Sequence, residues 1–369
     1  MATLKVLGHH TVYRNSQPSR FSEYVAFPAL VTLADNTLLC MCRHGTARES
    51  ADGEARIHRS TDGGRTWSPL PSLPKPDSTI NPLQLPGGLA VTSGREVVAW
   101  MKARHTMADQ PANYVSRSSD NGQSWTTLQR VDFEPFVGGA TVSQLSGLSD
   151  GTLILTGETP GDGARIDANH WITLISSSSD GGHTWEKIRA VHDSVNPHHF
   201  DLRITDLADG RWLAAYWTHD VQAERGLNVH LATSSDGGAT WTAPFDAGFW
   251  GQLTAVFRLQ SGRVLAVTNH RRPPLGIRAL LSEDAASGST TFDENDHIEL
   301  WGIEPPKVRN APTLAPKRDV VEQVLKSYHY FTFGTPTIAQ SSDGTIVVAF
   351  YVTEESVTYV RCCRLIERP

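Results

Sequence analysis

The chain has 369 residues, of which 39% are apolar and 20% are charged, and its 33 basic and 39 acidic side chains give a formal net charge of −6. This composition is too apolar for a disordered chain, and it lacks the basic excess of a nucleic-acid-binding protein. No apolar run approaches the roughly 18 residues that cross a bilayer, and the N-terminus has no signal-peptide core. We therefore expect a cytoplasmic protein without nucleic-acid or membrane partners.

Along the chain, a strand-like segment at residues 4–13 comes first, and an internal repeat follows it. The phrase S-x-D-x-G-x-[S/T]-W occurs four times, beginning at Ser60, Ser118, Ser178 and Ser234. The aspartates of these phrases are 58, 60 and 56 residues apart. A repeat at a fixed period of this length predicts a ring or an array built from one supersecondary unit.

A second series of signals consists of turn dipeptides that separate apolar or alternating runs. They stand at residues 35–36, 93–94, 150–151, 209–210, 261–262 and 343–344. Such dipeptides suit tight hairpins, whose central residues need positive φ. Each of the six units contains four strand-like runs, and helical periodicity is almost absent. We therefore predict an all-β fold: a six-bladed β-propeller with four-stranded antiparallel blades, a single domain over residues 1–369. Residues 4–13 should supply the outer strand of the last blade.

The spacing between the fifth and sixth turns is about 25 residues longer than the others. This excess predicts an insertion at about residues 303–332 that joins blades 5 and 6. Apolar residues at 320, 321, 324 and 325, preceded by Asp319 as a possible N-cap, indicate one short helix. The insertion is either a packing decoration or a lid that supplies Tyr330 or a neighbouring histidine to a pocket.

The repeated phrase resembles the Asp box, or BNR repeat, of the sialidase (neuraminidase) superfamily. The box itself is interpreted as structural, because its Asp can accept hydrogen bonds from the turn and its Trp can fill the gap between blades. The resemblance implies that these turns lie on the face away from the active site. The opposite face would receive the start of each blade's first strand and the loop after its second strand.

The loops expected on that opposite face are polar, and such loops are where sites are built on a rigid scaffold. Their arginines suit a carboxylate-bearing sugar, because Arg binds carboxylates through two parallel N–H bonds. The candidate substrate-binding residues are Arg43, His44, Arg48, Asn81, Arg104, His105, His170, Arg225 and Arg272. The expected partner is a carbohydrate substrate, and no pattern marks an oligomer interface.

The resemblance assigns family roles to several of these positions and also shows departures. Arg43 matches the supporting arginine of the family, and Arg225 and Arg272 match two arginines that bind the substrate carboxylate. Asp201 falls where a glutamate assists the nucleophile. The acid/base aspartate aligns with Asn81, for which Asp77 is a nearby substitute.

The remaining positions depart from the family. Ala26 stands where the family has a carboxylate-binding arginine, and Phe333 stands at the position of the tyrosine nucleophile. A phenyl ring cannot attack a sugar, so the departures predict a sialidase-like protein that is not an ordinary sialidase.

Three functions remain open. The first is an exo-acting glycoside hydrolase on an acidic or polar sugar, in which Asp201 works with Asp77, Glu158 or Asp52. The second is a uronate-directed lyase, whose candidate bases are His199, His170, His105 and Tyr330. The third is a non-catalytic glycan-binding propeller. The candidate catalytic residues are accordingly Asp201, Asp77, Glu158, His199 and Tyr330. No cofactor is expected, and no metal site is expected because the histidines lack ligand spacing.

Overall fold

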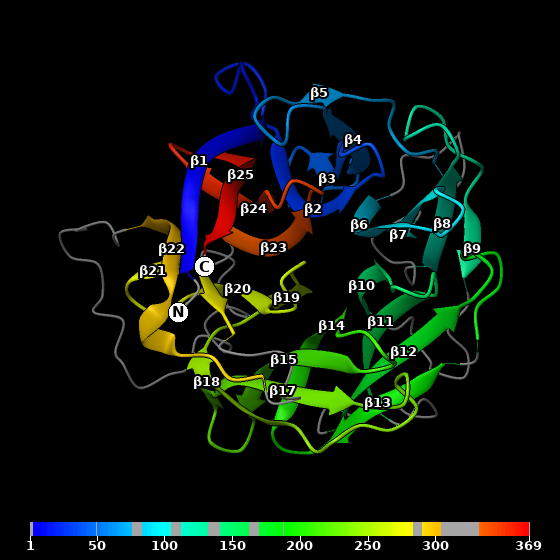
Figure 1. The fold of residues 1–369 in the computed structure, drawn as a ribbon. Helices are drawn as coiled ribbons and strands as arrows, with labels where there is room; N and C mark the ends of the chain where they lie inside the picture. The colour runs from blue at the N-terminus through cyan, green and yellow to red at the C-terminus, as the bar shows by residue number, and fades with distance from the viewer. Residues whose placement is uncertain are drawn as a thin grey trace.

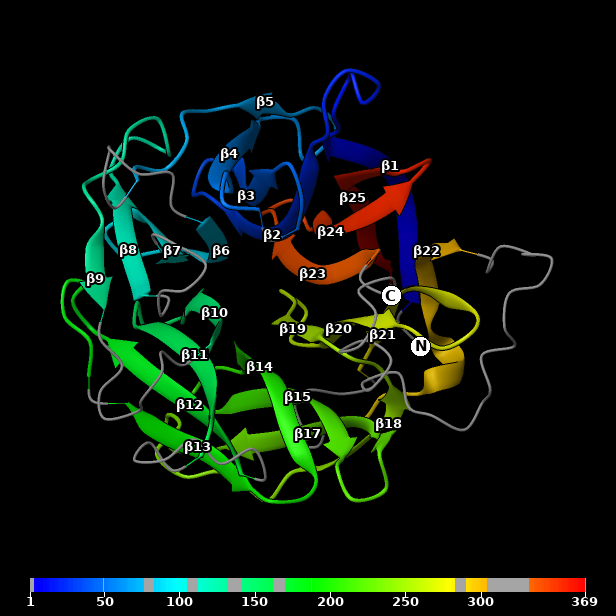
Figure 2. The ribbon, with the colours of Figure 1, turned by 180° about the vertical axis from the view of Figure 1, so that it is seen from behind.

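The fold is a ring of β-sheets around a central axis, known from a computed structural model. The structure describes residues 3–48, 50–75, 83–104, 112–131, 141–161, 170–186, 188–282, 290–303 and 332–368, with backbone only for residues 83–86, 104 and 141–143. Figure 1 shows the sheets arranged radially, and Figure 2 shows the same ring from behind.

Four sheets of the ring are separate from one another. The first contains β6 (Leu83–Val91), β7 (Val97–Arg104), β8 (Ala112–Ser118) and β9 (Gln129–Val131). The second contains β10 (Thr141–Gly147), β11 (Leu153–Pro160), β12 (Trp171–Ser178) and β13 (Arg189–Ser194). The third contains β14 (His198–Asp206), β15 (Trp212–Asp220), β17 (Asn228–Ser234) and β18 (Phe245–Trp250), with the short β16 (Arg225–Gly226) beside β15. The fourth contains β19 (Thr254–Arg258), β20 (Val264–His270), β21 (Leu275–Leu281) and β22 (Ile298–Ile303).

The remaining strands form one eight-stranded sheet, which joins the two ends of the chain. Its order is β23 (Phe333–Gln340), β24 (Ile346–Glu354), β25 (Val357–Arg368), β2 (Tyr24–Thr32), β3 (Leu38–Gly45), β4 (Glu54–Ser60) and β5 (Ser68–Pro69). The N-terminal strand β1 (Thr3–Tyr13) pairs antiparallel with β25, from Thr3 opposite Arg368 to Tyr13 opposite Val360. This pairing confirms that residues 4–13 complete the last repeat.

The predicted fold class is corrected in two respects. The strands do not form six separate four-stranded blades: four sheets are separate, one of these has five strands, and the rest is the eight-stranded sheet. The join is a parallel bridge between Tyr24 of β2 and Thr358 of β25. Turn signals count repeated units, but they do not reveal hydrogen bonds between the first and last units.

The second correction concerns the helical insertion. The described residues contain no α-helix; their only helical element is the 3₁₀ turn η1 (Glu294–Asp296). Residues 318–329, to which the helix was assigned, lie outside the described residues. Strand β22 ends at Ile303, so the described chain enters the insertion as an extended strand.

The Asp boxes have the structural role that the sequence predicted. In the first box, Asp62 accepts hydrogen bonds from Ser60 Oγ (2.8 Å), Thr66 N (2.9 Å) and Thr66 Oγ1 (2.6 Å). Trp67 donates from Nε1 to the carbonyl of Gly64 (3.2 Å), which lies at φ +86°. The box aspartates Asp120, Asp180 and Asp236 accept the equivalent bonds.

The apolar core lies in the gaps between neighbouring sheets. One cluster joins Leu213 and Leu231 of the third sheet to Val256 and Leu280 of the fourth. Tryptophans of the Asp boxes pack against such clusters, as Trp241 does beside β15 and β17. Second strands such as β3 are buried on both faces, which explains their nearly continuous apolar sequence.

The strand directions place the boxes and the site loops on opposite faces of the ring. In the antiparallel register of β3 and β4, Leu38 pairs with Ser60 of the first box, and His44 pairs with Glu54 at the far end. The end of a second strand therefore lies opposite to the box of the same repeat. The starts of the first strands and the ends of the second strands share this face.

Candidate active site

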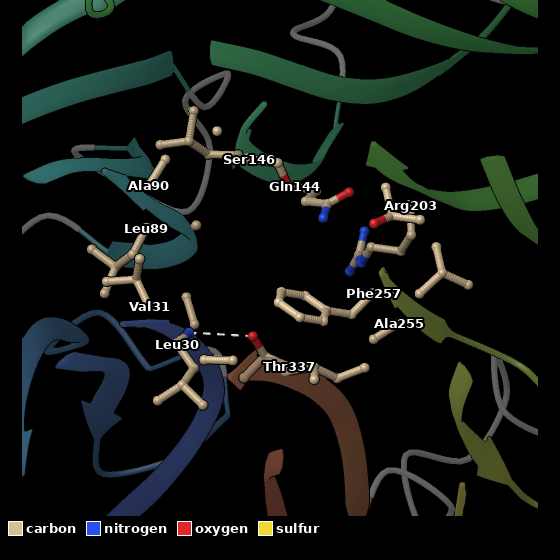
Figure 3. A pocket seen from close by; sticks show the side chains of 18 of the residues that line it. Leu30, Val31, Leu89, Ala90, Gln144, Ser146, Arg203, Ala255, Phe257 and Thr337 are labelled. Carbon is tan, nitrogen blue, oxygen red and sulfur yellow. Dashed lines mark hydrogen bonds between the residues drawn. The ribbon is translucent and has the colours of Figure 1, made fainter. Parts of the chain in front are cut away.

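A central cavity of about 460 Å³ lies inside the ring; Arg203 lines it, but the carboxyl pair described below does not. The innermost strands β2, β6, β10, β14, β19 and β23 contribute its walls. Most lining side chains are small or apolar, but Gln144 and Arg203 extend toward one another in Figure 3, near the ring of Phe257. Gln144 Oε1 accepts a 2.8 Å bond from the backbone of Ile204, which ties the second sheet to the third.

Two carboxyl side chains meet where the second and third sheets adjoin. Glu158 lies near the end of β11, and Asp201 lies near the start of β14. The backbone N–H of Asp201 donates to Glu158 Oε2 at 2.6 Å. Asp201 has φ +54°, and the register of β14 shifts between Phe200 and Arg203, as in a β-bulge. Bulges and positive φ at non-glycine residues are common beside active sites, where they re-aim a side chain.

Burial raises the pKa of both carboxyl groups, but the charges that act on them differ. Burial, and then the charge of Asp201, raise the pKa of Glu158 well above its usual range. Burial also raises the pKa of Asp201, but the positive charges of Arg203 and Arg271 oppose that rise. A pair of carboxyl groups with unequal pKa values can supply one proton donor and one ionised base. This is the arrangement that acid–base cleavage of a glycosidic bond needs.

Arg271 follows β20 and is held from two sides. Its Nη1 donates to Gln252 Oε1 at 2.6 Å, and its Nη2 donates to the carbonyl of Phe333 at 2.5 Å. Gly334, at φ +151°, is required there, because a Cβ would lie 2.7 Å from Arg271 Nη2. The guanidinium is therefore fixed in position while its charge acts on Asp201.

Two tyrosines complete the site on the side of the eight-stranded sheet. The ring centroids of Tyr24, at the start of β2, and Tyr351, on β24, are 6.3 Å apart. Phe27 packs edge-on against Tyr351 at 5.7 Å, and the guanidinium of Arg48 lies 5.7 Å from the Phe27 ring. Burial raises the pKa of Tyr351, although the charges of Arg271 and Arg48 oppose this. Both phenols therefore stay protonated at neutral pH.

Of the residues predicted from the sequence, the structure brings three into this centre. Glu158 and Asp201 form the carboxyl pair, and Arg48 faces the tyrosines. Asp52 instead caps its own loop by accepting a bond from Thr46 N at 3.1 Å.

Arg43 and His44 hold the structure together and do not reach the central cluster. Arg43 is completely buried and donates to the carbonyls of Ala47 (2.6 Å) and Ser50 (2.8 Å) in its own loop. His44 is also buried, with Nδ1 3.0 Å from Glu23 Oε1 and Nε2 3.0 Å from the Nε2 of His58.

His199 and His170 have partners other than the carboxyl pair. His199 Nε2 lies 3.1 Å from Nδ1 of His230, and burial first, then neighbouring histidines, lower its pKa to about 3. Although His199 lies two residues before Asp201 in β14, its ring partner is His230. His170, the residue before β12, has Nε2 3.0 Å from Oδ1 of Asp193 in β13.

Arg225 and Arg272 lie on the rim. Arg225 has 67% of its side chain exposed and stands 3.7 Å from Asp220 Oδ2. Arg272 donates to the carbonyl of Gly226 at 3.0 Å and stacks 4.3 Å from the centroid of Trp250. Arg271, its direct neighbour, occupies the central position instead.

The other predicted residues cannot be placed in the centre. Asp77, Asn81, His105 and Tyr330 lie outside the described residues, and of Arg104 only the backbone is described. Ala26 is fully buried, and Phe333 is 1% exposed with its carbonyl bound to Arg271.

Four residues of the centre are not among the candidate residues chosen from the sequence: Arg203, Arg271, Tyr24 and Tyr351. Arg203 lies in β14 among other polar and charged residues, so it does not stand out in the sequence. Tyr351 lies inside a continuous apolar run and does not stand out either. Within the described ranges, no group of three or more His, Cys, Asp or Glu side chains is arranged to hold a metal ion. None of the helices found there is long and apolar enough to span a membrane.

The sequence of this chain matches a known protein family and a curated relative. Residues 89–348 match the family model described as a BNR repeat-like domain. A sialidase of Paraclostridium sordellii is 24% identical over 244 residues, which are 57% of this chain and 59% of that protein. The chain thus matches less than two thirds of that relative's length. These matches confirm the resemblance to the sialidase superfamily.

Solved structures share the fold over almost the whole chain. A Dyadobacter fermentans protein of unknown function has a TM-score of 0.73 at 18% identity, covering 99% of both chains. An α-L-arabinanase of Penicillium chrysogenum complexed with arabinobiose has a TM-score of 0.64 at 14% identity, covering 98% of both chains. At such identities the likeness concerns the fold alone.

Proposed function

We propose that this chain, which belongs to the BNR repeat-like domain family, is a glycoside hydrolase that acts on an acidic or polar sugar. The observation that carries the proposal is the 2.6 Å contact between Asp201 N and Glu158 Oε2, which joins two carboxyl residues with unlike surroundings. The sialidase relative supports it at the level of the reaction class.

In this mechanism Glu158 is the acid. Its raised pKa keeps it protonated near neutral pH, so it can give its proton to the glycosidic oxygen as the C–O bond breaks. Asp201 is the base in this mechanism: burial raises its pKa, and the charges of Arg203 and Arg271 oppose that rise and favour its ionised form. It takes a proton from water, or attacks the anomeric carbon itself, and the net reaction adds one water across the bond.

The positive charges of the centre indicate which chemical groups the sugar carries. Arg271, Arg203 and Arg48 exceed the single ionised carboxylate, so the cluster suits a substrate with a carboxylate or several hydroxyls. An eliminating lyase receives less support from His199, one of its four candidate bases, because that histidine is held in another cluster with a pKa of about 3.

The test is a panel of fluorogenic glycosides of N-acetylneuraminic acid, glucuronic acid and L-arabinofuranose, with digalacturonic acid for elimination. We expect release of the fluorophore from at least one glycoside, loss of at least a hundredfold in Glu158→Gln and Asp201→Asn, and wild-type rates in the exposed-carboxylate control Glu355→Gln. Ultraviolet absorbance of an unsaturated uronate without hydrolysis would contradict the proposal. So would full activity of Asp201→Asn.

A further inference from the structure

An aromatic platform, made of Trp171, His198, Phe200 and Trp217, lies beside the carboxyl pair. Trp171 stacks on His198 with centroids 6.0 Å apart and meets Phe200 edge-on at 4.7 Å. Phe200 in turn lies 5.1 Å from Trp217. The rings come from β12, β14 and β15, so the platform bridges the second and third sheets at the same boundary as Glu158 and Asp201.

The platform is continuous with the catalytic pair. Phe200 directly precedes Asp201, and Trp171 pairs in register with Pro160, two residues after Glu158. The indole of Trp171 also lowers the pKa of Glu158, whereas burial and the charge of Asp201 raise it by more. A group resting on these rings would lie next to the acid.

Three of the four rings lie outside the apolar core, and His198 is buried beside them. Trp171, Phe200 and Trp217 are half-buried, and none of them belongs to the apolar clusters found among the described residues between the sheets. By contrast, Trp100 is 1% exposed and lies inside such a cluster. Half-buried aromatic rings beside polar catalytic groups are typical of ligand sites.

We propose that the aromatic platform is a saccharide subsite, so that the substrate is an oligosaccharide and not a sugar with a simple aglycone. The apolar C–H face of a sugar ring stacks on the platform, and its hydroxyls reach the adjoining pair His170 and Asp193. The inference rests on the proposed hydrolase function. Because Trp171 adjoins Glu158, which protonates the leaving oxygen, the stacked ring is the leaving-group sugar.

The first experiment compares oligosaccharides with methyl glycosides of the same terminal sugar, using sialyllactose and α-1,5-arabinotriose as the oligosaccharides. Trp217→Ala should lower the ratio of kcat/KM for the oligosaccharide over the methyl glycoside about tenfold, mainly through KM. Trp217→Phe, which keeps a ring, should recover most of the ratio. Trp241→Phe, in the fourth Asp box on the opposite face, is the matched control and should not change it. An unchanged ratio in Trp217→Ala overturns the inference.

A second measurement separates this inference from the proposed function. The inactive Glu158→Gln variant is titrated with the same oligosaccharides, and tryptophan fluorescence is recorded. A saturable change that Trp217→Ala abolishes and Trp241→Phe retains supports the subsite even if the wild type cleaves none of the panel. Absence of any change with both oligosaccharides overturns the subsite, whatever the hydrolysis assays show.

Discussion

The backbone N–H of Asp201 donates a hydrogen bond of 2.6 Å to Oε2 of Glu158, across the boundary between two sheets. The bond fixes one oxygen of the glutamate and leaves the other for a proton. The two residues are 43 positions apart, so their contact depends on the packing of β11 against β14 and not on local sequence.

Replacing Glu158 with Gln should stabilise the protein in alkaline solution. A carboxyl group with a raised pKa binds its proton more tightly in the folded state, so stability is lost as pH rises from about 4.3 through that raised pKa. Glu158→Gln cannot ionise and should exceed the wild type by roughly 1–2 kcal/mol at pH 8 but by much less at pH 4. Urea unfolding at both pH values measures this, with Glu355→Gln as control. An equal difference at both pH values would contradict the expectation.

Removing the charge of Arg271 should raise the pKa of Asp201. Arg203 and Arg271 both oppose the upward effect of burial on this carboxyl, so Arg271→Met shifts its titration to higher pH. Carboxyl ¹³C NMR of labelled aspartate measures the shift without a substrate. Arg272→Met is the matched control, since its exposed guanidinium binds Gly226 on the rim. Equal shifts in both variants would show that Arg271 has no special relation to Asp201.

Asp62→Asn should weaken the first Asp box. Burial alone would raise the pKa of Asp62, but bonds from Thr66, Ser60 and Arg65 lower it to about 2. The carboxylate therefore stabilises the fold above about pH 4, and this contribution is lost as pH falls toward 2. At pH 7 we expect a loss of about 1 kcal/mol after allowance for solvent screening, measured by thermal unfolding. Asp209→Asn, at an exposed turn, should change little; a similar loss there would refute the role of the box.

Buried histidines should make the protein sensitive to acid. Burial first, and then neighbouring charges, lower the pKa values of His58 and His199 to about 3. Both are neutral in the fold but gain protons in the unfolded chain below about pH 6.5. Stability should therefore fall between pH 6.5 and 3, by up to ~1.4 kcal/mol per pH unit for each histidine. Chemical unfolding of His58→Gln and His199→Gln across this range should give a smaller slope than the wild type; an unaltered slope would contradict this.

The sequence predicted those features whose causes are local or periodic. The bonds of the Asp62 box lie within a few residues, and strand phase placed Glu158 and Asp201 on one face of the ring. The alternation of a strand does not predict which side chain points inward beyond the strand's end. Arg271 and Arg272 are adjacent, and the contacts with Gln252 and Phe333 decide that Arg271 enters the centre.

Other failures have different causes. Arg43 lies where the sequence predicts a substrate-binding residue, but its guanidinium donates hydrogen bonds to backbone carbonyls of its own loop. A register shift between Gly334 and Thr337 breaks the alternation of β23, so the place of Phe333 could not be derived from its number in the strand. The parallel bridge from Tyr24 to Thr358 joins residues more than 300 positions apart, beyond any repeat signal.

The pairing of β1 with β25 has a consequence for biosynthesis. During translation from the N-terminus, the partner of the first strand leaves the ribosome after every other strand of the described ring. Until residues 357–368 emerge, the eleven-residue strand β1 lacks the strand with which it pairs in the finished ring, so that edge of β1 stays unpaired. We therefore expect nascent chains stalled before β25 to remain protease-sensitive, and ring closure to require that β25 has emerged.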